Sequence, residues 1–131
     1  LSLLTIMALV ASQSLLVPLQ TEFFALEGIT QLIKTIERIK SNLNPELEIK
    51  GILLTMYDKR NKLSNEVERE ARNYFKEKVY SSVIPRNVRL SEAPSHGVPV
   101  LVYDISCPGS KAYLSLVNEF MQQEKIVETA A

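Results

Sequence analysis

The spacing of apolar positions changes along the chain in a way that predicts alternating strands and helices. Residues 14–20 and 48–56 are short, nearly continuous apolar runs, which are typical of strands covered on both faces. Between them, residues 28–43 carry Ile and Leu at helical spacing, with most Lys, Glu and Arg on the other side. This pattern predicts an amphipathic helix that ends before Asn44-Pro45.

The alternation continues in the second half of the chain. Residues 65–78 have the pattern of a second amphipathic helix, with Ser64 as its expected N-cap. A third strand is expected over 79–84, a weakly patterned segment over 86–110, and a final helix over 110–123. Strand, helix, strand, helix, strand is typical of an α/β fold with a parallel sheet of about three strands and flanking helices.

The two ends of the chain call for separate interpretation. Residues 1–12 are apolar, and we expect them to form a buried helix of a larger α/β protein. A secretory signal is one alternative, but no basic residue precedes Lys34. A membrane-spanning helix is another, but Ser12, Gln13 and Ser14 interrupt the apolar run. Such a small sheet would expose apolar strand edges, which suggests missing partner strands. Residues 124–131 are expected to fray.

Composition limits the chemistry that the chain can perform. Its 131 residues fit one domain, and 15 basic residues balance 15 acidic ones, so any charged partner must be recognised by a local cluster. A single Cys107 and a single His96 provide neither a disulfide nor four zinc ligands. We expect no metal site, no catalytic residue and a reducing, cytoplasmic location, with His96 in an exposed loop.

Polar loops follow each predicted strand, at residues 18–22, 55–58 and 84–87. In parallel sheets, ligands bind at the carboxyl ends of the strands. These loops are therefore where we expect function to lie.

Three long sequence motifs at these strand ends resemble those of the ParA/Soj family of chromosome and plasmid partitioning ATPases. They are PLQTEFFALEG at residues 18–28, GILLTMYD at residues 51–58 and VIPRNVRLSEAPSHG at residues 83–97. The resemblance extends through Tyr103-Asp104 and Ala112-Tyr113 and covers residues 1–123. It implies a partial P-loop NTPase-like sheet that corresponds to the carboxyl-terminal half of the family's ATPase domain. Cys107 and Ser110 depart from the family's more frequent serine and alanine.

The resemblance also implies which parts of the ATPase are missing. The family's Walker A loop and Walker B aspartate lie before the point where this chain begins, and its four glycines form no phosphate-binding loop. The intact family uses ATP and Mg²⁺. We expect this chain alone to bind neither tightly and to be inactive in hydrolysis.

The part of the family's nucleotide site that this chain could still contain is the part that contacts the adenine base. The resemblance points to Met56, Asp58, Pro85 and Asn87, since apolar faces suit a purine ring and polar side chains suit its edge. The alternative is that they are strand-end packing residues and turn formers. The resemblance further suggests that Gln20 and Glu22 face the nucleotide or a dimer partner, although they could be an ordinary polar loop.

Basic residues follow the second and third strands, and the resemblance suggests nonspecific binding of double-stranded DNA. Residues 34–62 carry seven basic and four acidic side chains. Such a patch would bind phosphates without reading bases. The alternative is a solvated loop. The candidate DNA-binding residues are Lys59, Arg60, Lys62, Arg86 and Arg89.

The resemblance implies a nucleoid-associated protein that forms a homodimer and has a ParB/Spo0J-like partner. MinD-like membrane targeting is not expected, because the last thirteen residues contain three glutamates and one lysine. A single cysteine argues against the nitrogenase iron protein. Two alternatives are open: a standalone module that binds DNA or a homologue without ATPase activity, and a nonfunctional product of a truncated gene.

Overall fold

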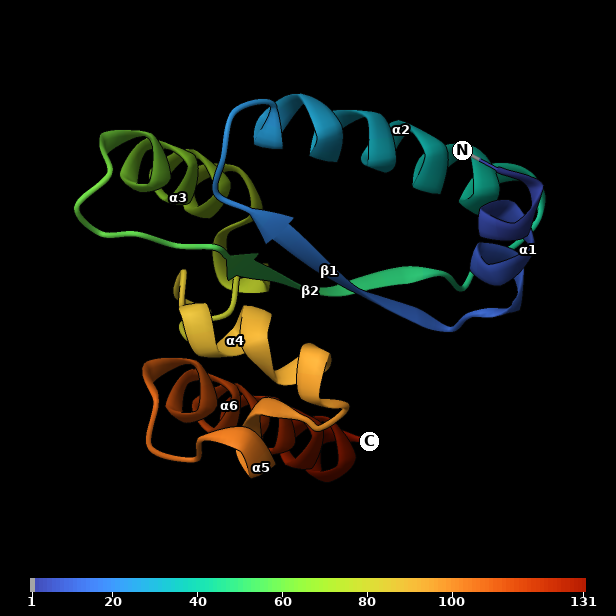
Figure 1. The fold of residues 1–131 in the computed structure, drawn as a ribbon. Helices are drawn as coiled ribbons and strands as arrows, with labels where there is room; N and C mark the ends of the chain where they lie inside the picture. The colour runs from blue at the N-terminus through green and yellow to red at the C-terminus, as the bar shows by residue number, and fades with distance from the viewer. Residues whose placement is uncertain (1) are drawn as a thin grey trace.

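A computed structural model describes residues 2–131 and has an α/β fold (Figure 1). Its elements follow one another along the chain as α1 (Leu3–Ala11), β1 (Ser14–Gln20), α2 (Ala25–Asn42), β2 (Glu48–Thr55), α3 (Lys62–Phe75), η1 (Lys76–Lys78), α4 (Val88–Glu92), η2 (Ala93–His96), α5 (Val100–Tyr103) and α6 (Pro108–Ala130).

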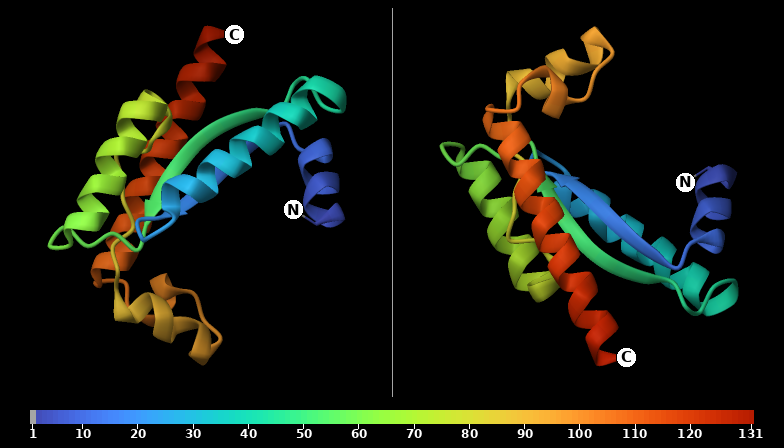
Figure 2. Two further views of the ribbon diagram at one scale, coloured as in Figure 1. Left: turned by 90° about the horizontal axis from the view of Figure 1, so that it is seen from above. Right: turned by 90° about the horizontal axis from the view of Figure 1, so that it is seen from below.

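The molecule has three layers. Helices α2 and α3 cover one face of the sheet, and α6 crosses the opposite face under β2 (Figures 1 and 2). The first face buries Ile52 and Leu54 of β2 against Ile29 of α2 and Val67 of α3. The sheet therefore separates two hydrophobic cores.

Strands β1 and β2 pair in parallel, as the sequence predicts, from Ser14 opposite Glu48 to Gln20 opposite Thr55. The expectation that both strands are covered on both faces holds only for β2. Leu16 of β1 is 41% exposed, because α6 lies under β2 and leaves the corresponding face of β1 uncovered (Figure 2).

The predicted third strand lies beside β2 but is not a continuous strand. Two isolated parallel bridges, Ile52 with Val79 and Tyr57 with Pro85, mark its ends. Between the bridges, residues 81–84 are not in regular secondary structure.

Tyr80 and Ile84 still donate to the β2 carbonyls of Ile52 and Leu54, and Glu119 of α6 binds the segment between them. Its two carboxylate oxygens accept hydrogen bonds from the backbone N–H groups of Ser81 at 2.7 Å and Ser82 at 2.9 Å. Because these donors bond to a side chain, they are not available to a strand ladder. Burial alone would raise the pKa of Glu119, but the hydrogen bonds from Ser82 and Ser81 outweigh it and hold the pKa below its ordinary value.

Helix α3 begins earlier than predicted. Asn61 is its N-cap and accepts a hydrogen bond from the Leu63 N–H at 2.9 Å. The expectation that Ser64 caps the helix is wrong: Ser64 lies inside the first turn and is buried. Asn61 is a better cap because its extended backbone lets its side chain reach the free N–H groups of that turn.

The segment after the sheet is more helical than its weak pattern suggests, since it forms α4, η2 and α5 before α6. Helix α6 continues through residues 124–130, where the sequence predicts a frayed tail. Lys50 of β2 helps to hold this end, because it forms an ion pair with Glu124 and its Nζ lies 4.8 Å from the Phe120 ring centroid.

Helix α1 forms as expected, but it is covered on one side only. Leu9 packs against Ile36 and Ile39 of α2, whereas Leu3 and Met7 are exposed. Within residues 2–131, no helix is long and apolar enough to cross a membrane.

Candidate functional site

Three loops meet at the carboxyl end of the sheet, as the sequence predicts. The loop after β1 is tied to β2 by a hydrogen bond from the Thr21 N–H to the Thr55 carbonyl at 3.0 Å. The loop after β2 is tied to residues 84–86 by bonds from Tyr57 N–H to Ile84 and from Arg86 N–H to Tyr57, at 3.1 and 3.0 Å. Side chains from all three segments therefore share one edge.

A pair of buried hydroxyl groups connects these loops. The Thr21 hydroxyl donates toward the carbonyls of Thr55 and Met56, each at 3.2 Å. Ser64 Oγ lies 3.2 Å from Thr21 Oγ1 and donates to the Thr21 carbonyl at 3.2 Å. The Asp58 N–H in turn donates to Ser64 Oγ at 3.4 Å. Sequence reasoning missed Thr21, because its partners lie more than 30 residues away.

A cleft of about 310 Å³ opens between the loops. It brings together four predicted site residues, Glu22, Met56, Asp58 and Arg86. The remaining lining residues are Thr21, Phe23, Asn61, Leu63 and Ser64.

Met56 holds a strained position beside the cleft. Its φ of 53° lies in the left-handed region, which costs a side-chain-bearing residue about 1–2 kcal/mol. The Thr21 hydroxyl, which bonds to the Met56 carbonyl, helps to fix this conformation. The turn directs the chain from β2 into the loop that carries Asp58.

Asp58 and Arg60, predicted to have different roles, bind each other. Arg60 Nε and Nη2 donate to the two Asp58 carboxylate oxygens at 3.1 and 3.2 Å. The Arg60 N–H also donates to Asp58 Oδ1 at 3.0 Å. These hydrogen bonds from Arg60 hold the pKa of Asp58 below its ordinary value. Arg60 is nevertheless 87% exposed, so its guanidinium is accessible to a phosphate.

Arg86 and Arg89 also have carboxylate partners. Arg86 Nη2 lies 2.5 Å from Glu22 Oε1. This ion pair joins the segment of Arg86 to the loop after β1. Arg89 contacts Glu92 at 3.0 Å and Asp104 at 3.4 Å. A phosphate that binds either arginine must compete with these carboxylates.

The other candidates are less constrained. Within residues 2–131, Lys59 and Lys62 have no carboxylate within 4 Å. Lys59 lies in the loop after β2, Lys62 is the first residue of α3, and Gln20 is exposed at the end of β1.

Pro85 and Asn87 lie next to the cleft in the chain but do not line it. Pro85 is paired with Tyr57 in the isolated bridge. The Oδ1 atom of Asn87 is buried and has no hydrogen-bond partner within the part of the chain that the structure describes. A buried acceptor without a donor is unfavourable, and this atom is such an unsatisfied acceptor beside the cleft.

Two exposed phenylalanines were not singled out from the sequence. Phe23 and Phe24 connect β1 to α2, and their ring centroids lie 4.5 Å apart, edge to face. Phe24 has a left-handed φ of 67°. Two adjacent phenylalanines in a polar loop after the first strand are the sequence feature that could have identified them.

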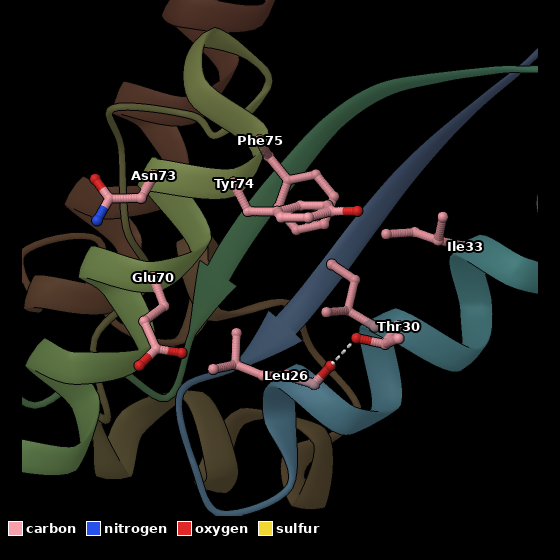
Figure 3. Close-up of a pocket in the computed structure, with 8 residues that line it drawn as sticks. Leu26, Thr30, Ile33, Glu70, Asn73, Tyr74 and Phe75 are labelled. Atoms are coloured by element: carbon pink, nitrogen blue, oxygen red, sulfur yellow. Dashed lines mark hydrogen bonds between the residues drawn. The ribbon is translucent and has the colours of Figure 1, made fainter.

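A larger groove of about 430 Å³ lies elsewhere, between α2 and α3 (Figure 3). Leu26 and Ile33 form one wall, and Tyr74 and Phe75 form the other. None of the predicted site residues lines it.

The remaining polar candidates have structural roles. His96 is exposed, as expected, and stacks on Tyr103 at a centroid distance of 4.9 Å. Cys107 is buried and caps α6 by accepting a hydrogen bond from the Ser110 N–H at 3.4 Å. Among residues 2–131, no group of three His, Cys, Asp or Glu side chains could hold a metal ion.

The fold is that of a P-loop NTPase-like α/β domain, in partial form. A crystal structure of cobyrinic acid a,c-diamide synthase from Mycobacterium smegmatis with bound ADP and magnesium matches with a TM-score of 0.70 and 27% identity. The match covers 95% of this chain and 44% of that chain. The complex of that enzyme with an ATP analogue and magnesium matches with a TM-score of 0.68.

Sequence relatives support a more specific family. The chain is 58% identical over 125 residues to the chromosome partitioning protein ParA of Caulobacter vibrioides, covering 95% of this chain and 47% of the relative. It is 52% identical over 119 residues to the sporulation initiation inhibitor protein Soj of Bacillus subtilis, covering 91% and 47%. A family model described as an AAA domain matches residues 1–49. These similarities support the ParA/Soj family of P-loop ATPases.

The chain spans about half the length of the curated relatives that it matches. What those whole proteins bind and do is therefore a basis for proposals about this chain.

Proposed function

We propose that this chain is the carboxyl-terminal half of a ParA/Soj-like partitioning ATPase and carries its adenine-side loops and a nonspecific DNA-binding patch. The observation that supports this most directly is the shared cleft, where Met56 and Asp58 of one loop face Glu22 and Arg86 from two others. It lies at the carboxyl end of a parallel sheet, where such folds bind nucleotides.

The nucleotide contacts belong to the base. The thioether of Met56 offers an apolar surface beside the cleft. The unpartnered Oδ1 of Asn87 is buried next to the cleft, and a rotation of its side chain would let it accept a hydrogen bond from the adenine amine. Pro85 and Asp58 flank these two groups in the chain. Bound ATP would bring phosphoryl chemistry, and its phosphates and Mg²⁺ need a glycine-rich loop and a Walker B carboxylate from outside these 131 residues.

The DNA contacts are electrostatic. Lys59, Arg60 and Lys62 extend from the loop after β2, and Arg86 and Arg89 come from the adjacent segment. Lysine and arginine at one edge bind phosphates without sequence preference, with an affinity that falls steeply with salt. In this proposal the DNA is double-stranded and either chromosomal or plasmid.

Assembly is the third part of the proposal. The free edge of β1 and the exposed side of α1, with Leu3, Met7 and Leu16, form an apolar surface that suits further strands of the same sheet. Glu22 and Gln20 stand where a homodimer partner or the nucleotide would lie. The intact protein is cytoplasmic, nucleoid-associated and responsive to a ParB/Spo0J-like partner.

The DNA patch is tested with labelled duplex DNA titrated with the purified chain across a salt series. We expect salt-sensitive binding that weakens at least about tenfold in an Arg60→Glu, Arg89→Glu variant. Arg38→Glu is the matched control, because Arg38 is exposed on α2 near the opposite end of the sheet. Equal losses in both variants, with unchanged circular dichroism, would contradict a patch at this edge.

The base site is tested by NMR titration with adenosine, which needs no phosphate-binding loop. We expect the Asn87 side-chain amide and the Met56 methyl to shift, and Asn87→Ala to abolish the shift of the Met56 methyl. A guanosine titration is the control for recognition of the amine. Equal shifts with both nucleosides would count against Asn87 as an adenine acceptor.

A further inference from the structure

Phe23 and Phe24 present two aromatic rings to solvent at the carboxyl end of the sheet, and the proposed function does not use them. The side chains are 72% and 69% exposed. Folded proteins usually bury phenylalanine, because each ring removes a large apolar area from water. Two adjacent exposed rings therefore indicate a binding surface.

Basic side chains lie at the same edge of the sheet as this pair. Phe23 lines the cleft together with Arg86 and Asn61. Asn61 stands in the chain between Arg60 and Lys62. Aromatic rings next to lysine and arginine match the two parts of a single-stranded nucleic acid, since bases stack on rings and phosphates pair with cations.

The charges around the pair fit a nucleic acid better than a protein partner. Glu22 directly precedes Phe23 and is paired with Arg86 at the rim of the cleft. Glutamate is depleted at the centres of protein interfaces, although arginine and phenylalanine are enriched there. Single-strand binding surfaces, in contrast, combine basic grooves with solvent-facing aromatic rings.

We propose that Phe23 and Phe24 stack on unpaired bases and that this edge of the chain binds single-stranded DNA. The inference goes beyond the proposed function, in which duplex DNA contacts only the basic residues. Both proposals use the same basic residues. Duplex bases are stacked inside the helix and do not reach the two rings, so the two kinds of DNA depend differently on the phenylalanines.

The experiment measures fluorescence anisotropy of labelled oligothymidylate of about 20 nucleotides and of a labelled duplex of equal length. We expect a Phe23→Ala, Phe24→Ala variant to bind the single strand at least about tenfold more weakly, and the duplex within about twofold of the unaltered chain. Tyr74→Ala is the matched control, because its ring is 73% exposed in the groove between α2 and α3.

A Phe23→Leu, Phe24→Leu variant separates stacking from apolar contact, because leucine keeps the apolar surface without the ring. Loss of single-strand affinity in both double variants, with unchanged circular dichroism, supports the proposal. It is overturned if the alanine variant binds the single strand normally. It is also overturned if the leucine variant binds normally, which would indicate an apolar docking surface for a protein. Absence of duplex binding in the unaltered chain would contradict the proposed function. The single-strand measurements would still test the role of the two phenylalanines.

Discussion

At the residue scale, the close packing of Tyr80 against Gly51 determines which side chains β2 can carry. A Cβ atom on Gly51 would lie 2.4 Å from Tyr80 Cε2. Tyr80 is fully buried among Leu53, Ile84 and Leu116, so its ring has little room to move. The glycine is thus required by packing on the α6 side of the sheet.

We therefore expect Gly51→Ala to lower the free energy of unfolding by about 1–3 kcal/mol through overpacking. Gly28→Ala is the matched control, because nothing lies within 4 Å of a Cβ at that position of α2. It should raise the free energy of unfolding by about 0.5–1 kcal/mol, since alanine favours helix. Urea denaturation measures both, and effects of the same sign would contradict the packing argument.

The pairing of Asp58 with Arg60 leads to a prediction about DNA affinity. In the unaltered chain the Arg60 guanidinium binds both carboxylate oxygens of Asp58. Asp58→Asn removes this negative charge from the proposed patch and frees the guanidinium. We expect duplex affinity to rise about two- to fivefold at low salt and the gain to shrink as salt increases. Anisotropy measures the change, and Glu37→Gln on the exposed surface of α2 is the control. A loss of affinity in the asparagine variant would show that Asp58 supports the patch rather than competing for it.

At the element scale, Glu119 joins α6 to the segment that carries Pro85 and Arg86. Its folded-state pKa lies below the ordinary value of 4.5. A depressed carboxyl pKa contributes stability above the unfolded-state pKa, and this contribution is lost as the pH falls through the folded-state pKa.

We expect Glu119→Gln to lower the free energy of unfolding by about 1 kcal/mol at pH 7, because one of the two backbone N–H groups, which are exposed or partly buried, loses its charged acceptor. The difference from the unaltered chain should shrink as the pH falls through the folded-state pKa of Glu119, which lies below 4.5. Chemical denaturation at several pH values measures it. A difference that does not change between pH 7 and pH 3 would be inconsistent with an ionised Glu119.

Helix α1 depends on one side chain of the loop after α2. The Asn44 amide donates to the carbonyls of Leu9 and Val10 at 3.1 Å and of Ser12 at 2.7 Å, where α1 ends. We expect Asn44→Ala to lower the local opening free energy of α1 by about 1–2 kcal/mol. Hydrogen exchange measures this, and amides of α3 should be unaffected. Equal changes in both helices would mean that the variant acts on global stability.

Periodicity was sufficient to predict β1, β2 and α2, because each is specified by its own apolar pattern. It failed where a distant residue decides the outcome. Ser64 does not cap α3 because Asn61 starts the helix three residues earlier, and the Ser64 hydroxyl instead bonds to Thr21 in the loop after β1. In the third strand, Glu119, far along the chain, binds the N–H groups of Ser81 and Ser82 between the residues that bond to β2.

The candidate site divides in the same way. The shared edge follows from parallel topology, so the meeting of Met56 and Arg86 could be predicted. The partners of the arginines could not, because the contact of Arg86 with Glu22 joins residues 64 positions apart.

At the scale of the whole molecule, the free edge of β1 is the largest departure from a closed fold. Helix α2 covers one face of this strand (Figure 2), and Leu16 is 41% exposed. An open edge beside exposed apolar side chains favours association with another chain.

We expect the chain to self-associate with increasing concentration, and Leu16→Lys to shift this association to at least about threefold higher concentration. Leu114→Lys on α6 is the matched control, because Leu114 is 43% exposed. Sedimentation equilibrium measures both. An equal effect of the two lysines would attribute the association to general hydrophobicity rather than to the strand edge.

The hydroxyl pair of Thr21 and Ser64 has a consequence for how the two proposed ligands affect each other. Because this pair joins the loop after β1, the loop after β2 and the first turn of α3, a ligand that immobilises one segment reduces the motion of the others. A second ligand at the same edge then loses less conformational entropy on binding. Nucleoside and DNA would thus show positive cooperativity without a change of shape, and the effect would be reciprocal: each would increase the affinity for the other by the same factor.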